Sequence, residues 1–208
     1  MRLPSEALLT LLALVACASE PALPPGTVQP QRIAALDFAD EVLALGHRPC
    51  AFTTSWGVVR PYVAAALAGS TAITTLYGTS EPSYEAILSA QPDLILLGGA
   101  TMRRPERLRS IAPTVILETK DPRQRLREIA AVLGVPERAR TVLAAYEAKL
   151  EDSRRLLHQR LGNETVAVIR VRTRSYQLLG GTWMGPFFYQ ELGLTRPEMI
   201  RRRLLDTK

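Results

Sequence analysis

Residues 82–97, PSYEAILSAQPDLILL, join a helical pattern to a short apolar run and so indicate the fold class. A proline at the start of a helix and an acidic side chain in its first turn, here Glu85, are typical of a helix amino terminus. The run at residues 93–97 is apolar at consecutive positions, as in strands that are buried on both faces of a parallel sheet. Together they predict one unit of an α/β fold.

Short apolar runs alternate with helical patterns on both sides of this stretch. Strands are predicted at residues 33–36, 51–54, 72–76 and 114–117. Helices are predicted to end at Gly46, to start at Pro105, and to run over residues 122–133 with Gly134 just beyond. Strands that alternate with helices in this order predict a parallel sheet covered by helices.

The longest helical pattern in the chain covers residues 136–161. It is longer than the crossover helices, so we expect it to connect two lobes. Strands at residues 165–171 and 176–179 and a helix at 186–192 follow it. These elements predict only the beginning of a second sheet.

The composition excludes several classes of protein. Of the 208 residues, 47% are hydrophobic and 22% are charged, which excludes wholesale disorder and a multi-span membrane architecture. Two Cys and two His are too few and too scattered for a disulfide framework, a zinc site or an iron–sulfur cluster. The motifs of serine hydrolases, zinc proteases and phosphate-binding loops do not occur. We therefore expect neither an enzyme nor a protein-bound metal or cofactor.

The formal net charge of +6 is concentrated near the end of the chain. Residues 1–169 carry 18 basic and 17 acidic side chains, whereas residues 170–208 carry 8 and 3. A chain that is neutral over most of its length has no distributed phosphate-binding face, so a nucleic acid is not an expected partner. Residues 196–208 hold five of the basic groups and are predicted to lie outside the fold.

The amino terminus has the pattern of a secretory signal peptide. One Arg is followed at residues 7–16 by an apolar stretch that is too short to span a bilayer. Residues 14–17, LVAC, resemble the bacterial lipobox, in which the cysteine, here Cys17, is lipidated; ordinary cleavage after small residues is the alternative. Residues 18–31 contain four prolines and are predicted to tether the domain to the membrane.

Six segments of the chain, two of which overlap residues 82–97, occur in the order and at the spacing of one protein family. They are QRIAAL at 31–36 with LALG at 43–46, GTSEPSYEAI at 78–87, QPDLIL at 91–96, LRSIAPTV at 108–115, IAAVLG at 129–134 and LGL at 192–194. The chain thereby resembles the class III periplasmic binding proteins, the substrate-binding lipoproteins of ABC importers for ferric siderophores and cobalamin. The resemblance implies two α/β lobes joined by a long helix, with the ligand in the cleft between them.

On this basis the chain divides into a signal peptide with lipobox (1–17), a tether (18–31), a Rossmann-like first lobe (32–135), a connecting helix (136–162) and a partial second lobe (163–208). Only 44 residues run from Thr165 to the last residue. A complete doubly wound lobe of roughly 100 residues does not fit there. We therefore expect an α/β two-lobe fold whose second lobe is incomplete through truncation or a frameshift.

Arginines and aromatic residues are the candidate ligand contacts. Arg170 and Arg172 are at alternate positions where a predicted strand runs into a loop, and a guanidinium forms forked hydrogen bonds with carboxylate, catecholate or hydroxamate oxygens. A solvated edge strand that uses charge to prevent aggregation is the open alternative. The other candidates lie beyond the carboxyl ends of predicted strands, where ligands of α/β sheets gather, or on the second lobe: Trp56, Arg60, Ser80, Arg103, Arg104, Tyr176 and Trp183.

The resemblance implies that Glu85 pairs with arginines of a permease; stabilisation of its own helix by its charge is the alternative. The leading hypothesis is a monomeric, lipid-anchored binding protein on the outside of the cell membrane or in the periplasm. It would deliver a ferric siderophore, with the iron held by the chelator, to the transmembrane subunits of an ABC permease. A cobalamin or haem binding protein of the same class is one alternative, and a truncated remnant without transport function is another.

Overall fold

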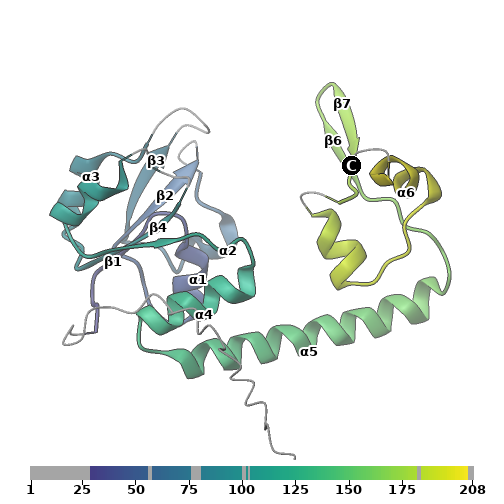
Figure 1. The fold of residues 1–208 in the computed structure, drawn as a ribbon, viewed down its shortest axis with the longest axis horizontal. Coiled ribbons are helices and arrows are strands. Elements are labelled where there is room, and N and C mark those ends of the chain that lie inside the picture. Colours follow the sequence, from purple (N-terminus) through teal and green to yellow (C-terminus); the bar gives the residue numbers. More distant parts are fainter. Residues whose placement is uncertain are drawn as a thin grey trace, which may run out of the picture. The chain divides into compact units, whose positions relative to one another are not determined.

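The fold consists of two compact units, Met1–Pro136 and Glu137–Lys208, and each is described by itself (Figure 1). The structure is a computed structural model. It describes residues 29–55, 58–75, 81–99, 102, 104–181 and 184–205.

The first unit contains a five-stranded sheet in the order β3-β2-β1-β4-β5, in which all neighbours are parallel. The strands are β1 (Ile33–Ala35), β2 (Ala51–Ser55), β3 (Thr71–Thr75), β4 (Leu94–Gly98) and β5 (Thr114–Leu117). All five were predicted, with small differences at their ends. Because β4 pairs with β1, on the other side from β2 and β3, the direction of winding reverses between β1 and β4. This doubly wound order confirms the predicted Rossmann-like fold of the first lobe.

Strand β4 lies at the centre of the hydrophobic core. Leu94, Ile95 and Leu96 have no exposed surface, and Leu97 is 1% exposed. Burial on both faces therefore explains the consecutive apolar residues. Asp93 fixes the start of the strand, because its two carboxylate oxygens accept hydrogen bonds from the backbone N–H groups of Gln31 and Arg32 at 2.8 and 2.9 Å.

Helices cover both sides of this sheet, with α3 on one side and α1 and α4 on the other (Figure 1). The helices are α1 (Ala39–Ala44), α2 (Pro61–Ala64), α3 (Tyr84–Ser89), the 3₁₀ helix η1 (Pro105–Ser110) and α4 (Pro122–Val132). Ser83 caps α3, because its hydroxyl accepts a hydrogen bond from the backbone N–H of Ala86 at 3.3 Å. Gly134, with a φ of 71°, follows α4 as predicted. The sequence did not predict the single turn of α2. The helix that was predicted to start at Pro105 is the 3₁₀ helix η1.

The second unit is built on helix α5 (Pro136–Leu161), which has the predicted bounds. Leu150 on this helix is 4% exposed. Glu191 joins α5 to the π-helical segment η2 (Phe187–Glu191), because its carboxylate accepts a hydrogen bond from the hydroxyl of Tyr146 at 2.5 Å. Its backbone carbonyl accepts a second one from Nε of Arg154 at 2.5 Å. These contacts pack η2 against α5. The sequence predicted an α-helix over residues 186–192, and the structure has the π-helical segment η2 there.

Strands β6 (Ile169–Arg172) and β7 (Ser175–Leu178) form an antiparallel hairpin. Strand β6 begins at residue 169 and not at the predicted residue 165. The reason is that the backbone at residues 166 and 168 forms hydrogen bonds with a side chain and not with a neighbouring strand. The hydroxyl of Tyr189 donates to the carbonyl of Val166 at 3.0 Å and accepts from the N–H of Val168 at 3.2 Å. Thr165 forms a single parallel bridge with Thr195.

Residues 196–205 belong to the fold of the second unit, so the prediction that this tail lies outside it is wrong for these residues. Helix α6 (Glu198–Leu205) follows Pro197, and its Ile200 is 4% exposed. The guanidinium of Arg196 lies 4.9 Å from the centre of the Tyr189 ring. A proline and an acidic first turn start this helix, and Ile200 supplies its buried contact.

Candidate ligand-binding site

Two acidic residues lie at the carboxyl ends of the strands of the first unit. Asp37 follows β1, and its carboxylate accepts a hydrogen bond from the backbone N–H of Gly98 at 2.7 Å. Glu118 follows β5 and lies so near to Gly99 that a Cβ there would be 2.5 Å from its Oε1. The middle of this edge therefore carries negative charge. An anionic ligand bound here needs cationic groups from the surrounding loops.

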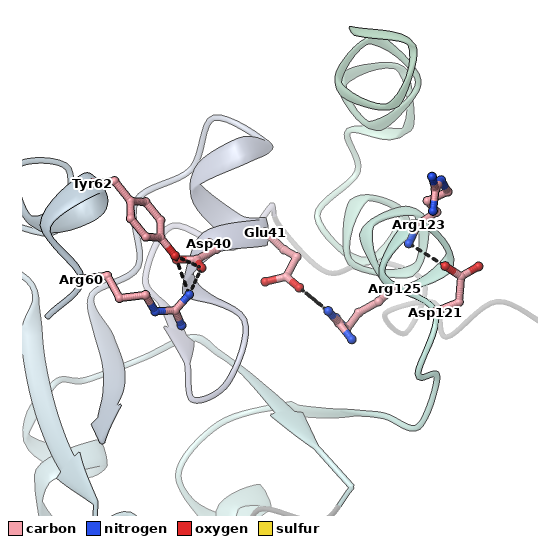
Figure 2. A network of polar contacts seen from close by, with 7 residues as sticks. All are labelled: Asp40, Glu41, Arg60, Tyr62, Asp121, Arg123 and Arg125. Atoms are coloured by element: carbon pink, nitrogen blue, oxygen red, sulfur yellow. Dashed lines mark hydrogen bonds and ion pairs between the residues drawn. The ribbon is translucent and has the colours of Figure 1, made fainter. Parts of the chain in front are cut away.

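Arg60 is the predicted ligand residue that the structure places most clearly at this edge (Figure 2). It immediately precedes α2, and its Nη1 forms an ion pair with Asp40 in the first turn of α1. The same Nη1 donates a hydrogen bond to the hydroxyl of Tyr62 at 2.7 Å. This bond, together with the charge of Asp40, raises the pKa of the Arg60 guanidinium. Because both contacts use Nη1, the Nε and Nη2 groups can form a forked pair with a ligand oxyanion.

A second ion pair fixes the helix that carries Asp40 (Figure 2). Oε1 of Glu41 accepts a hydrogen bond from Nε of Arg125 in α4 at 2.8 Å and forms an ion pair with its Nη2, also at 2.8 Å. The two side chains are only 18% and 21% exposed. The Arg125 guanidinium also lies 5.3 Å from the centre of the Phe38 ring. These contacts join α1 to α4 and thereby hold Asp40 and Arg60 in place. Arg125 is a structural residue that no sequence pattern singled out.

Glu85 lies at the surface, in the first turn of α3. Its neighbour Tyr84 donates a hydrogen bond from its hydroxyl to the backbone carbonyl of Arg104 at 3.0 Å. The guanidinium of Arg107 in η1 lies 4.6 Å from the centre of the Tyr84 ring. The side chain of Arg104 is exposed. These contacts fix the amino terminus of α3 against η1 and leave the Glu85 carboxylate accessible to a partner.

The register of the hairpin separates the candidate residues of the second unit. Arg170 is opposite Gln177 and Arg172 is opposite Ser175, so these four residues share one face. Tyr176 is opposite Val171 and therefore lies on the other face. Arg170 is half-buried, whereas Val171 and Tyr176 are 79% and 74% exposed. A ligand bound on the face that carries Arg170 and Arg172 therefore does not contact the ring of Tyr176, which lies on the opposite face.

Five predicted residues lie outside the part of the chain that the structure describes: Cys17, Trp56, Ser80, Arg103 and Trp183. Among the described residues, no group of three or more His, Cys, Asp or Glu side chains is placed to hold a metal ion. Within the same residues, none of the helices is both long enough and apolar enough to pass through a bilayer.

The residues that sequence reasoning missed are those that position Arg60, namely Asp40 and Tyr62. Asp40 is 20 positions away from Arg60 in the sequence. The two residues come together because they follow β1 and β2, which are neighbouring parallel strands. Tyr62 is two residues from Arg60, and an aromatic hydroxyl so close to a predicted ligand arginine is a local signal that could have pointed to it.

Comparisons with known proteins agree with this architecture. A profile of the periplasmic binding protein family matches residues 36–196. The iron(3+)-hydroxamate-binding protein FhuD of Bacillus subtilis (strain 168) is 23% identical over 105 residues, which are 49% of this chain and 33% of FhuD. The chain thus spans about a third of the length of this curated relative.

Two solved structures show the same fold. SirA of Staphylococcus aureus has a TM-score of 0.70 and 20% identity, and the match covers 85% of this chain and 66% of SirA. The FhuD fold-family protein BSU3320 of Bacillus subtilis has a TM-score of 0.71 and 21% identity, with 86% of this chain and 69% of that protein covered. The matched family consists of extracytoplasmic binding proteins and not of enzymes. Because the profile covers more than half of the chain and the fold agrees, the chain belongs to the periplasmic binding protein family.

Proposed function

We propose that the protein is the solute-binding protein of an ABC importer and captures an anionic ferric siderophore. The observation that carries this proposal is the family match over residues 36–196. The names of its relatives support the ligand class: FhuD is an iron(3+)-hydroxamate-binding protein, and SirA has been crystallised with staphyloferrin B. The iron arrives inside its chelator, so the protein supplies contacts to the organic shell and no metal ligand.

Charge complementarity is the basis of capture in this proposal. Arg60 offers two N–H directions that no described residue uses, beside the carboxyl ends of the sheet, and its position is fixed by Asp40 and Tyr62. Arg170 and Arg172 offer a second cationic surface on the hairpin. Both sites suit carboxylate, catecholate or hydroxamate oxygens. The remaining proposed contacts are Trp56, Ser80, Arg103, Arg104, Tyr176 and Trp183.

Delivery to the permease is proposed to use Glu85 and a lipid anchor at Cys17. The Glu85 carboxylate is exposed on a helix end that Ser83 and Tyr84 hold rigidly, which suits an ion pair with a partner arginine. Diacylglycerol on Cys17 supplies at least two acyl chains, and two chains are enough for stable anchoring.

Titration of the purified chain with ferric siderophores, followed by Trp fluorescence, tests the proposal. The panel contains hydroxamate, catecholate and citrate-type chelates, with cobalamin and haem as the alternative ligands. We expect saturable binding of at least one ferric siderophore and a loss of about tenfold or more in Arg60→Gln. The matched control is Arg127→Gln, which removes an exposed arginine from α4. Binding of cobalamin or haem alone would favour the alternative, and no response to any ligand would contradict both.

A further inference from the structure

A cavity of about 480 Å³ lies in the first unit at the amino-terminal ends of β1, β2 and β3. This edge of the sheet is opposite to the one that carries Arg60. The cavity is lined by residues that immediately precede the three strands, among them Arg32, Arg48 and Ser70. None of the lining residues is acidic. The wall of the cavity therefore has a positive charge that the proposed siderophore site does not use.

Arg48 is the cationic group that is best placed to bind a ligand. Its Nη2 lies 3.4 Å from the position that a Cβ would take on Gly69, so the guanidinium packs against glycine backbone. Gly69 has a φ of 83°, which further favours glycine at this position. Within the described residues no carboxylate pairs with Arg48, and its side chain is exposed. Its forked donors are thus available to an oxyanion.

Arg32 and Ser70 add a second charge and a hydroxyl. Nε and Nη2 of Arg32 donate to the backbone carbonyls of Gln91 and Ala90 at 2.8 and 2.5 Å. Those carbonyls orient the guanidinium without neutralising its charge. The Ser70 hydroxyl oxygen is buried and has no hydrogen-bond partner among the described residues. Because Ser70 lines the cavity, rotation about its Cα–Cβ bond can turn this hydroxyl toward a bound ligand and give it a partner.

Cys50 and Asp93 are the other ionisable groups to weigh near the cavity. Burial raises the pKa of the Cys50 thiol, which lines the cavity, so the thiol stays protonated and neutral at physiological pH. The carboxylate of Asp93, which also acts on Cys50, keeps its negative charge, and its two oxygens accept hydrogen bonds from the backbone N–H groups of Gln31 and Arg32. Two guanidinium groups against this one carboxylate leave a net positive charge beside the cavity.

We propose that this cavity binds a phosphate-type oxyanion, held by the Arg48 guanidinium and the Ser70 hydroxyl with charge supplied by Arg32. The phosphate has two possible sources, inorganic phosphate and the headgroup of an anionic phospholipid. Gln31 lines the cavity and is the last residue of the predicted tether, so an anchor at Cys17 would attach at this same edge. The site lies away from the carboxyl ends of the strands and does not depend on siderophore capture.

The test uses the full chain with Cys17→Ser, which removes lipidation from every sample. Calorimetric titration with inorganic phosphate measures the first source. Sedimentation with phosphatidylcholine vesicles, with and without phosphatidylglycerol, measures the second. Arg48→Gln is expected to weaken the oxyanion-dependent binding by about tenfold to a hundredfold, and Ser70→Ala by a few-fold. Arg127→Gln removes one positive charge from α4 and is expected to leave the oxyanion-dependent binding unchanged.

The two arms identify the source. Saturable phosphate binding without an effect of phosphatidylglycerol assigns the site to free phosphate. Phosphatidylglycerol-dependent sedimentation that Arg48→Gln abolishes assigns it to the lipid headgroup. Binding of neither probe, or binding that Arg48→Gln leaves unchanged, overturns the proposal. Circular dichroism of each variant confirms that the fold is retained, and siderophore titration of the same samples tests the separate site.

Discussion

Asp40 and Arg60 form an ion pair beside the carboxyl ends of the sheet, although 20 positions separate them in the sequence. Each side chain stands at the start of a helix, Asp40 in α1 and Arg60 just before α2. Tyr62 completes the contact, because its hydroxyl accepts from Arg60 and lies 3.3 Å from the Asp40 carboxylate. The cation is therefore held in one orientation before any ligand arrives, which lowers the entropy cost of binding.

The first prediction concerns Tyr62. Tyr62→Phe removes one hydrogen bond to Arg60 and changes no charge. Under the proposed function, the affinity for ferric siderophore should fall by about twofold to tenfold, because Arg60 loses part of its support. Tyr62 is 72% exposed, so the free energy of unfolding should change by less than about 0.5 kcal/mol. Fluorescence titration and urea unfolding measure the two quantities. Unchanged affinity in Tyr62→Phe alongside a loss in Arg60→Gln would show that Arg60 needs no such support.

A second prediction concerns the ion pair between Glu41 and Arg125. Removal of one partner leaves a mostly buried charge without its counter-ion, so Glu41→Gln should lower the free energy of unfolding by about 1–3 kcal/mol. The matched control is Glu137→Gln, which breaks an exposed pair with Arg140 and should cost less than about 0.5 kcal/mol. Urea unfolding compares the two variants. Equal effects would mean that the burial of the α1–α4 pair has no energetic consequence.

Gly185 gives a third prediction, on the second unit. A Cβ at this buried position would overlap the backbone carbonyl oxygen of Gly180, which cannot rotate away as a side chain can. Gly185→Ala should therefore lower the free energy of unfolding by about 2–4 kcal/mol. In Gly193→Ala nothing lies within 4 Å of the added methyl group, and only the φ of 70° opposes it. That variant should lose about 1 kcal/mol. Thermal unfolding distinguishes the two, and a smaller loss in Gly185→Ala than in Gly193→Ala would contradict this close approach.

The fourth prediction follows from the raised pKa of Cys50. Burial raises it above the ordinary value of 9.0, so above that pH the native state binds more protons than the unfolded state. Stability from this group is therefore present below pH 9 and is lost as the pH rises through the native pKa. In the Cys17→Ser background Cys50 is the only thiol. Its alkylation by iodoacetamide should be slower than that of a free cysteine and should reach half its maximal rate above pH 9. Half-maximal alkylation below pH 9 would show that the thiol is not desolvated.

The sequence predicts those parts of the fold that depend on local pattern. The run Leu94–Leu97 indicates a buried strand because every side chain in it is apolar, and the pattern needs no knowledge of partners. Helix α5 is equally predictable, because Pro136 starts it and Gly162, with a φ of 53°, follows its last residue. Repetition of such local signals is enough to predict a parallel sheet covered by helices, whereas the Rossmann-like first lobe was expected from the family resemblance.

The parts that depend on distant partners could not be predicted in the same way. The start of β6 is set by Tyr189, whose hydroxyl binds the backbone of Val166 and Val168 from 23 and 21 positions away. The orientation of Arg60 is likewise set by Asp40. Sequence patterns identify Arg60 and Tyr176 as polar or aromatic candidates, but only the three-dimensional pairing shows what each of them faces.

The pairing of β6 with β7 also limits how this hairpin can change in length. Arg170 and Arg172 alternate with Ile169 and Val171, and each faces a fixed partner on β7. The two-residue turn at 173–174 fixes this register, so the insertion or deletion of one residue in the turn would shift β6 by one position against β7 and turn its arginines to the face of Tyr176. A change of two residues would restore the original alternation. The hairpin can therefore tolerate changes in length only in even steps if the arginine face is to be kept.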